Sequence, residues 1–81
     1  MQEEVFHEVS DEFINLANEL NGDWATPMLS AAIMHAASRY NAFHALETAT
    51  DPGAREQAVQ FLCEQYRRML VENMDELLQA N

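Results

Sequence analysis

The sequence predicts an all-α protein, an antiparallel three-helix bundle whose long C-terminal helix is a candidate dimer surface. Three observations support this fold class. Apolar residues recur every three or four positions through three segments, which is the period of an amphipathic helix. Turn signals at residues 21–27 and 50–53 separate the segments. No segment shows a convincing period-two strand pattern.

The first helix is predicted over about residues 3–21. Asn21 and Gly22 follow it as a typical helix-ending pair. One side of the helix carries an apolar stripe made of Phe6, Val9, Phe13, Leu16 and Leu20. The opposite side is polar and mostly acidic, with Glu4, Glu8, Asp11, Asn15 and Glu19.

The second helix is predicted over about residues 27–48. Thr26 is the expected N-cap and Pro27 the first helical residue. The apolar stripe consists of Leu29, Ile33, Ala36, Tyr40 and Phe43. Alanines cover much of the remaining surface, either because another helix approaches closely or because alanine is simply a good helix former.

The third helix is predicted over about residues 52–79, with Asp51 as N-cap and Pro52 at the first helical position. At about 1.5 Å per residue it would be roughly 40 Å long. Its stripe consists of Val59, Leu62, Tyr66, Met69, Leu70 and Leu77. Arg55 and Asn73 interrupt this stripe with polar side chains.

Three apolar residues of the third helix, Phe61, Val71 and Leu78, fall off its main stripe. Burying them requires a second surface, so we expect a homodimer that uses this helix. Asn73 lies on the stripe, where an amide is unfavourable unless it is hydrogen-bonded. We expect its amide to pair with Asn18, with Asn41 or with the matching residue of a second chain. The alternative is that the helix has left the core there and Asn73 is solvated.

Composition narrows the functional classes. The 81 residues make one small domain, 1–81, with 14 acidic and four basic residues and a net charge of -10. Nucleic-acid binding is not expected, because a binder must neutralise phosphates. Binding to anionic membrane surfaces is not expected for the same reason, and no apolar run reaches the roughly 20 residues needed to span a bilayer. The negative charge either keeps the protein soluble or attracts a basic protein partner. A lone cysteine and no signal-peptide pattern indicate the cytoplasm.

Metal and nucleophilic chemistry are poorly supported. Glu4 and His7 have the Glu-x-x-His spacing of helical di-iron sites, but the second such motif is missing. His44 and Glu47 have that spacing in reverse order. Cys63 lies at the edge of the third stripe, where a structural cysteine is favoured over a reactive one. We expect no catalytic residue, metal or cofactor.

The arginines suggest the main alternative to an interaction module. Arg39 lies on the shoulder of its helix, where it would clamp a carboxylate of a neighbouring helix. Together with Arg67 it would instead form an anion-binding pocket, with Tyr40 and Tyr66 nearby. This second possibility would make the chain a small-anion-binding protein or an enzyme.

Three segments carry a resemblance to a known family. They are DEFINLANEL, SAAIMHAASRYNAF and FLCEQYRRMLVENMDELL, and the resemblance extends from about Phe6 to Leu78. The chain resembles a small bacterial family of unknown function, domain-of-unknown-function family 3144. The resemblance implies an all-helical cytoplasmic bacterial protein and brings no activity, cofactor or catalytic residue. It draws attention to Asn18, Arg39, Asn41, Tyr66, Arg67 and Asn73.

Taken together, the sequence favours a protein-interaction or self-association module over an enzyme. The expected partner is a second copy of the chain or another protein.

Overall fold

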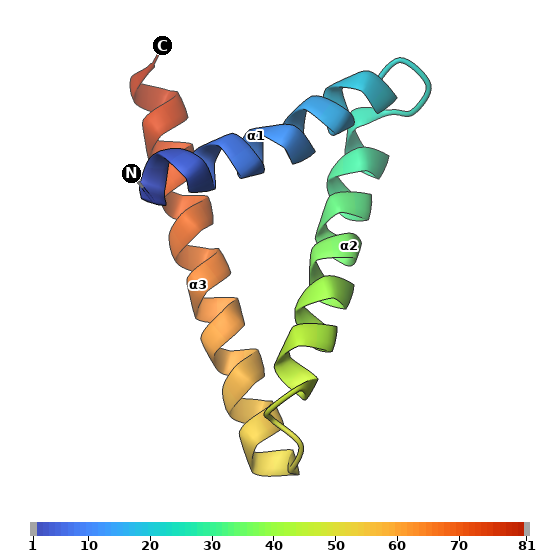
Figure 1. Ribbon diagram of the computed structural model, residues 1–81. Coiled ribbons are helices and arrows are strands. Elements are labelled where there is room, and N and C mark those ends of the chain that lie inside the picture. Colours follow the sequence, from blue (N-terminus) through green and yellow to red (C-terminus); the bar gives the residue numbers. More distant parts are fainter. Residues whose placement is uncertain (1, 81) are drawn as a thin grey trace. The chain divides into compact units, whose positions relative to one another are not determined.

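The computed structural model describes residues 2–80 and contains three α-helices there (Figure 1). They are α1 (Gln2–Leu20), α2 (Thr26–Leu46) and α3 (Pro52–Gln79). No strand occurs within these residues. The prediction of an all-α protein with three helices is confirmed, and each helix boundary lies within two residues of its expected position.

The turn after α1 begins where Asn21 and Gly22 predict it, but it closes differently. The Asn21 N–H donates to the Ala17 carbonyl at 3.0 Å, and the Trp24 N–H donates to the Leu20 carbonyl at 3.1 Å. No residue in the described part of the chain has a positive φ, so Gly22 does not adopt the left-handed conformation common after helices. Continued hydrogen bonding to the last carbonyls of α1 closes this turn instead.

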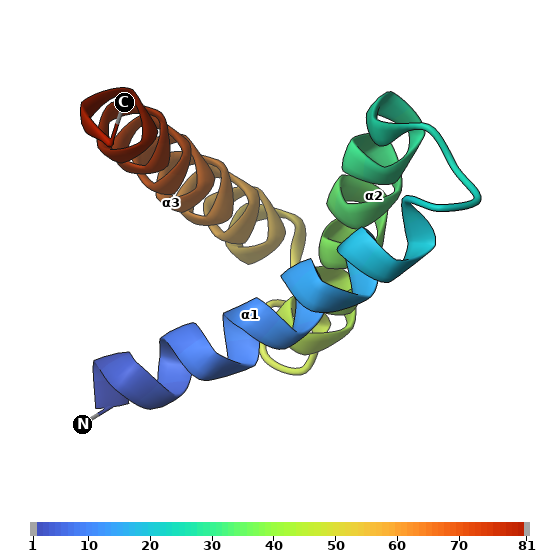
Figure 2. The same cartoon turned by 90° about the horizontal axis from the view of Figure 1, so that it is seen from above.

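Thr26 does not act as the predicted N-cap of α2. It is the first residue of the helix, and the Ala25 carbonyl accepts the hydrogen bond of the Leu29 N–H at 3.1 Å. The Thr26 hydroxyl donates to the Asn21 side-chain oxygen at 3.2 Å. Thr26 therefore links the two ends of the turn. This turn is the thin connection between α1 and α2 in Figure 2.

The connection between α2 and α3 contains a side-chain cap. Helix α2 ends two residues earlier than expected because the Glu47 and Thr48 N–H groups donate three residues back, to His44 and Ala45, which tightens the last turn. Asp51 then caps α3 as predicted, accepting a hydrogen bond from the Ala54 N–H at 2.9 Å.

The chain divides into two compact units within α2, an N-terminal unit (Met1–Arg39) and a C-terminal unit (Tyr40–Asn81). In the N-terminal unit, α1 and α2 diverge from their turn (Figures 1 and 2). Its partly shielded residues are Ala17 and Leu29. In the C-terminal unit, the partly shielded residues are near the second turn: Ala45, Ala49, Ala54, Ala58 and Leu62.

No side chain among residues 3–80 is fully buried. Each unit therefore partly shields alanines and one leucine near its turn, and leaves most of its large apolar side chains accessible. None of the helices in the described part of the chain combines the length and apolarity needed to cross a membrane.

Candidate functional site

The binding residues predicted from the sequence are divided between the two units. Arg39 is the last residue of the N-terminal unit, and Tyr40 is the first residue of the C-terminal unit. Tyr66, Arg67 and Asn73 lie on α3. All five side chains are exposed.

Because Arg39 and Arg67 belong to different units, the anion pocket that would combine them remains a prediction from the sequence. The same holds for Arg39 as a clamp between helices. Asn18 lies in the N-terminal unit and Asn41 in the C-terminal unit, and the pairing of either amide with Asn73 likewise stays a prediction.

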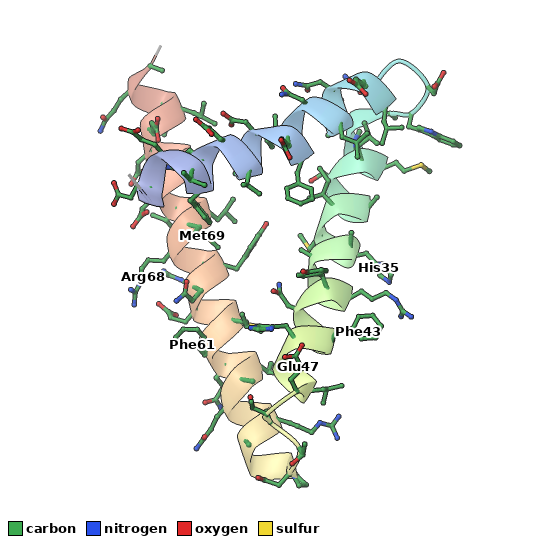
Figure 3. All side chains as sticks on the ribbon, in the orientation of Figure 1. His35, Phe43, Glu47, Phe61, Arg68 and Met69 are labelled. Carbon is green, nitrogen blue, oxygen red and sulfur yellow. The ribbon has the colours of Figure 1, made fainter. Side chains whose placement is uncertain are left out.

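The arginines of α3 have acidic neighbours at helical spacing. Arg68 follows Glu64 by four residues and precedes Glu72 by four. Opposite charges at this spacing stabilise an exposed helix by about 0.2–0.5 kcal/mol per pair. Phe61 and Arg68 project from the same side of α3 (Figure 3). The spacing of these charges favours the helix without any ligand.

The side chains considered for metal or nucleophilic chemistry do not assemble into a centre. Within residues 2–80, no group of three or more His, Cys, Asp or Glu side chains is arranged to hold a metal ion. His44 Nδ1 lies 3.9 Å from Glu47 Oε1, with both side chains largely exposed. Cys63 is an exposed free thiol, whereas the sequence favours a buried structural cysteine. Because no side chain among residues 3–80 is fully buried, no core encloses this thiol.

The most extensive chemical feature of the N-terminal unit is the apolar stripe of α1. Its five members have exposed fractions between 39% and 66% and are Phe6, Val9, Phe13, Leu16 and Leu20. Sequence periodicity places these five residues on one side of the helix. It does not single out Ile14 or Trp24, which are also exposed, because neither repeats at the stripe's spacing.

The C-terminal unit has a second row of side chains, apolar in its middle and polar at both ends, which we call the α3 seam. It consists of side chains at alternating steps of four and three residues: Arg55, Val59, Leu62, Tyr66, Met69 and Asn73. The predicted interface residues Phe61, Val71 and Leu78 are exposed as well but lie outside the seam. Helix α3 therefore presents apolar side chains in more than one direction.

A shallow hollow follows one face of α2. Its lining residues are Pro27, Ser30, Ala31, Met34, His35 and Ser38. The Ser38 hydroxyl donates to the His35 carbonyl at 2.7 Å, so part of its polar lining is already hydrogen-bonded. Sequence reasoning did not identify this hollow, although the small residues on that face of α2 are the signal for it.

The charges are distributed unequally among the helices. Helix α1 has six acidic residues and no Lys or Arg. Helix α2 has no acidic residue and one arginine, Arg39. Helix α3 has five acidic residues and three arginines. The apolar stripe of α1 is therefore surrounded by negative charge alone, whereas the α3 seam is surrounded by both signs.

Comparison with protein-family models gives a match over most of the chain. The family model described as "Protein of unknown function (DUF3144)" matches residues 6–78. No curated protein and no solved structure shows significant similarity to the chain.

Proposed function

Because the chain belongs to the DUF3144 family, whose function is unknown, we propose its role from its own surface: it is a protein-interaction module that associates with a second copy of itself. The observation on which this role mainly rests is the accessibility of apolar side chains on regular helices. Most large apolar side chains between Val5 and Leu78 are exposed, with exposed fractions between 39% and 78%.

Exposure on this scale favours association. Scattered single apolar residues are normal on a soluble protein, but the stripe of α1 and the α3 seam are rows of neighbours along a helix. Rows of this kind are typical of interaction surfaces. Fully burying one Leu or Phe side chain is worth about 1.5–3 kcal/mol, so a few of them suffice to offset the entropy lost on association.

Chain length supports the same role. A domain of this size buries a smaller share of its surface than a larger one. Small domains commonly gain stability from disulfides, metals or oligomerisation. With one cysteine in the sequence, no intrachain disulfide can form. Association then supplies stability that the isolated chain lacks. The free thiol is consistent with a reducing cytoplasm.

Net charge opposes self-association without preventing it. Two copies of a chain with a net charge of -10 repel each other. At physiological ionic strength the screening length is about 8 Å, so repulsion between distant carboxylates is weak while apolar contact is unaffected. We therefore expect association to strengthen as salt is added, which is the opposite of what attraction to a basic partner would give.

Sedimentation equilibrium tests the proposal. The mass should approach twice 9.2 kDa as the concentration rises from low to high micromolar, and the transition should move to lower concentration in high salt. A constant monomer mass at high micromolar concentration in both salts would overturn the proposal. Binding of a polybasic amphipathic peptide that weakens with salt, with no dimer, would point to a basic partner instead.

A further inference from the structure

We propose that two copies of this chain pair through their α3 seams in antiparallel orientation, centred on Glu64, so that Arg55 of each copy meets Asn73 of the other. The inference rests on the proposed self-association. It adds the surface, the orientation and the register.

The α3 seam has the spacing of a helix-pairing surface. Its alternating steps of four and three residues are those of the a and d positions at which two helices interdigitate. Val59, Tyr66 and Met69 have exposed fractions of 44–54%, and Leu62 is half-buried near the second turn. Most of the seam is therefore available to a second helix.

The chemical pattern of the seam is symmetric about its middle. Four apolar residues are flanked by one polar residue at each end. Arg55 and Asn73 both lie nine positions from Glu64, Val59 and Met69 both lie five, and Leu62 and Tyr66 both lie two. In an antiparallel pair, each residue meets the one equally far from the centre on the other chain. Val59 then packs on Met69, Leu62 on Tyr66, and the polar residues meet each other.

Arg55 decides the orientation. In a parallel pair each seam residue meets its own copy, so two guanidinium groups would face each other and repel. In the antiparallel pair, the two arginines are separated by 18 residues, which is about 27 Å along the helix. Each guanidinium instead meets an Asn73 amide, whose oxygen accepts from its N–H donors.

Arg55 and Asn73 also decide the register. A shift of one heptad toward the C-terminus would place Leu62 against Asn73 and Val59 against Glu76. A shift the other way would place Arg55 against Tyr66. Either shift buries a polar group against an apolar one, which is unfavourable. Only the register centred on Glu64 pairs the polar residues and keeps the four apolar layers together.

Charge explains why α3 associates and α1 does not. Two copies of α1 would bring 12 acidic residues together with no Lys or Arg. Two copies of α3 bring ten acidic residues together with six arginines. Repulsion across an α3 pair is therefore partly compensated, while repulsion across an α1 pair is not.

Distances between spin labels test the pairing. In a Cys63→Ser background, Gln57→Cys and Asp75→Cys place single labels outside the seam. Along the helix axis, the two labels of an antiparallel dimer centred on Glu64 are about 21 Å apart for position 57 and about 33 Å apart for position 75. The separation should therefore be clearly longer at position 75. A parallel dimer would give the same separation at both positions and overturn the proposal.

A wrong register gives a different result. A one-heptad shift toward the C-terminus would reverse the order, to about 31 Å for position 57 and about 22 Å for position 75. That reversal would overturn the register while leaving self-association intact. A monomer mass with no dipolar coupling would overturn the proposed function itself, so the two failures are distinguishable.

A matched pair of variants tests the role of Arg55. Arg55→Leu removes the charge that opposes the parallel orientation, so a second population with the same separation at both positions should appear. Arg68→Leu, on the side of α3 away from the seam, should leave the distances unchanged. An unchanged distribution in Arg55→Leu would overturn the assignment of Arg55 as the residue that determines orientation.

Discussion

At the scale of single residues, Asp51 has a defined contact and a defined consequence. Its carboxylate accepts the Ala54 N–H at 2.9 Å, which satisfies one of the otherwise unpaired donors at the start of α3. Asp51→Ala should lower the free energy of unfolding by about 1 kcal/mol, measured by urea titration with far-UV circular dichroism. Asp51→Ser, which keeps a capping oxygen, is the control and should retain most of the stability. Equal losses in both variants would contradict the capping role.

Gly22 provides a second test at this scale. Its φ is negative, and an added Cβ would approach the Glu19 carbonyl oxygen at 3.7 Å, an ordinary contact. Gly22→Ala should therefore raise the free energy of unfolding by about 0.4–1 kcal/mol, because it restricts the unfolded chain without straining the folded one.

Gly53→Ala is the comparison variant for Gly22→Ala. A Cβ at Gly53 would lie 3.3 Å from Asp51 Oδ1, the capping oxygen. The gain in helix propensity there is offset by the close contact between the added Cβ and the capping carboxylate, so this variant should be stabilised less than Gly22→Ala. Thermal unfolding of the two variants side by side gives the answer, and destabilisation by Gly22→Ala would disprove the reasoning.

At the scale of the helices, α1 contains unfavourable charge neighbours. Glu4, Glu8 and Glu12 follow one another at four-residue spacing, and like charges at this spacing destabilise a helix by about 0.2–0.5 kcal/mol per pair. Glu8→Lys should turn two repulsions into two attractions and stabilise the chain by about 0.8–2 kcal/mol.

The control for Glu8→Lys is Glu8→Gln, which only removes the repulsions and should give a smaller gain. Added salt should stabilise the unsubstituted chain more than Glu8→Lys, because salt screens the repulsion that the variant no longer has. Urea titrations at two ionic strengths measure both effects. A loss of stability in Glu8→Lys at low salt would show that Glu8 has a favourable role of its own.

Asn73→Leu tests the polar end of the α3 seam. In the proposed register, the substitution leaves the guanidinium of Arg55 of the second copy against an apolar side chain, which is unfavourable, and it removes a polar residue that fixes the register. The midpoint of dimer formation should therefore move to higher concentration, and the choice of register should loosen. Gln60→Leu adds a similar apolar group away from the seam and should change neither. Identical behaviour of both variants would mean that Asn73 is only solvated.

Helix positions were predictable from the sequence because local chemistry determines them. Asp51 and Pro52 identify the start of α3, and their cap forms as expected. The start of α2 was predicted one residue too late, with Thr26 as N-cap. The Thr26 hydroxyl instead bonds to the Asn21 side chain across the turn, a pairing that helix propensity cannot reveal. Arg39 and Arg67 illustrate why a binding site is harder to predict from the sequence than a helix. Whether two distant side chains converge depends on how helices pack, which periodicity does not specify.

At the scale of the whole molecule, the exposure of large side chains has a calorimetric consequence. Unfolding raises the heat capacity mainly by bringing apolar surface into water. A fully packed domain of 81 residues would show an increment of about 1 kcal/mol/K. In a chain without a buried side chain among residues 3–80, much of that surface is already hydrated before unfolding. Differential scanning calorimetry of dilute, monomeric chains should therefore give a smaller increment and a broad transition.

Assembled chains should behave differently in the same calorimeter. Association removes apolar surface from water, so the heat-capacity increment per chain should grow with concentration and the transition should sharpen and move to higher temperature. A full increment in dilute solution, independent of concentration, would mean that each chain shields its own apolar rows. The hydration of these helices, rather than their hydrogen bonds, then determines whether a solitary chain melts gradually and an assembled one cooperatively.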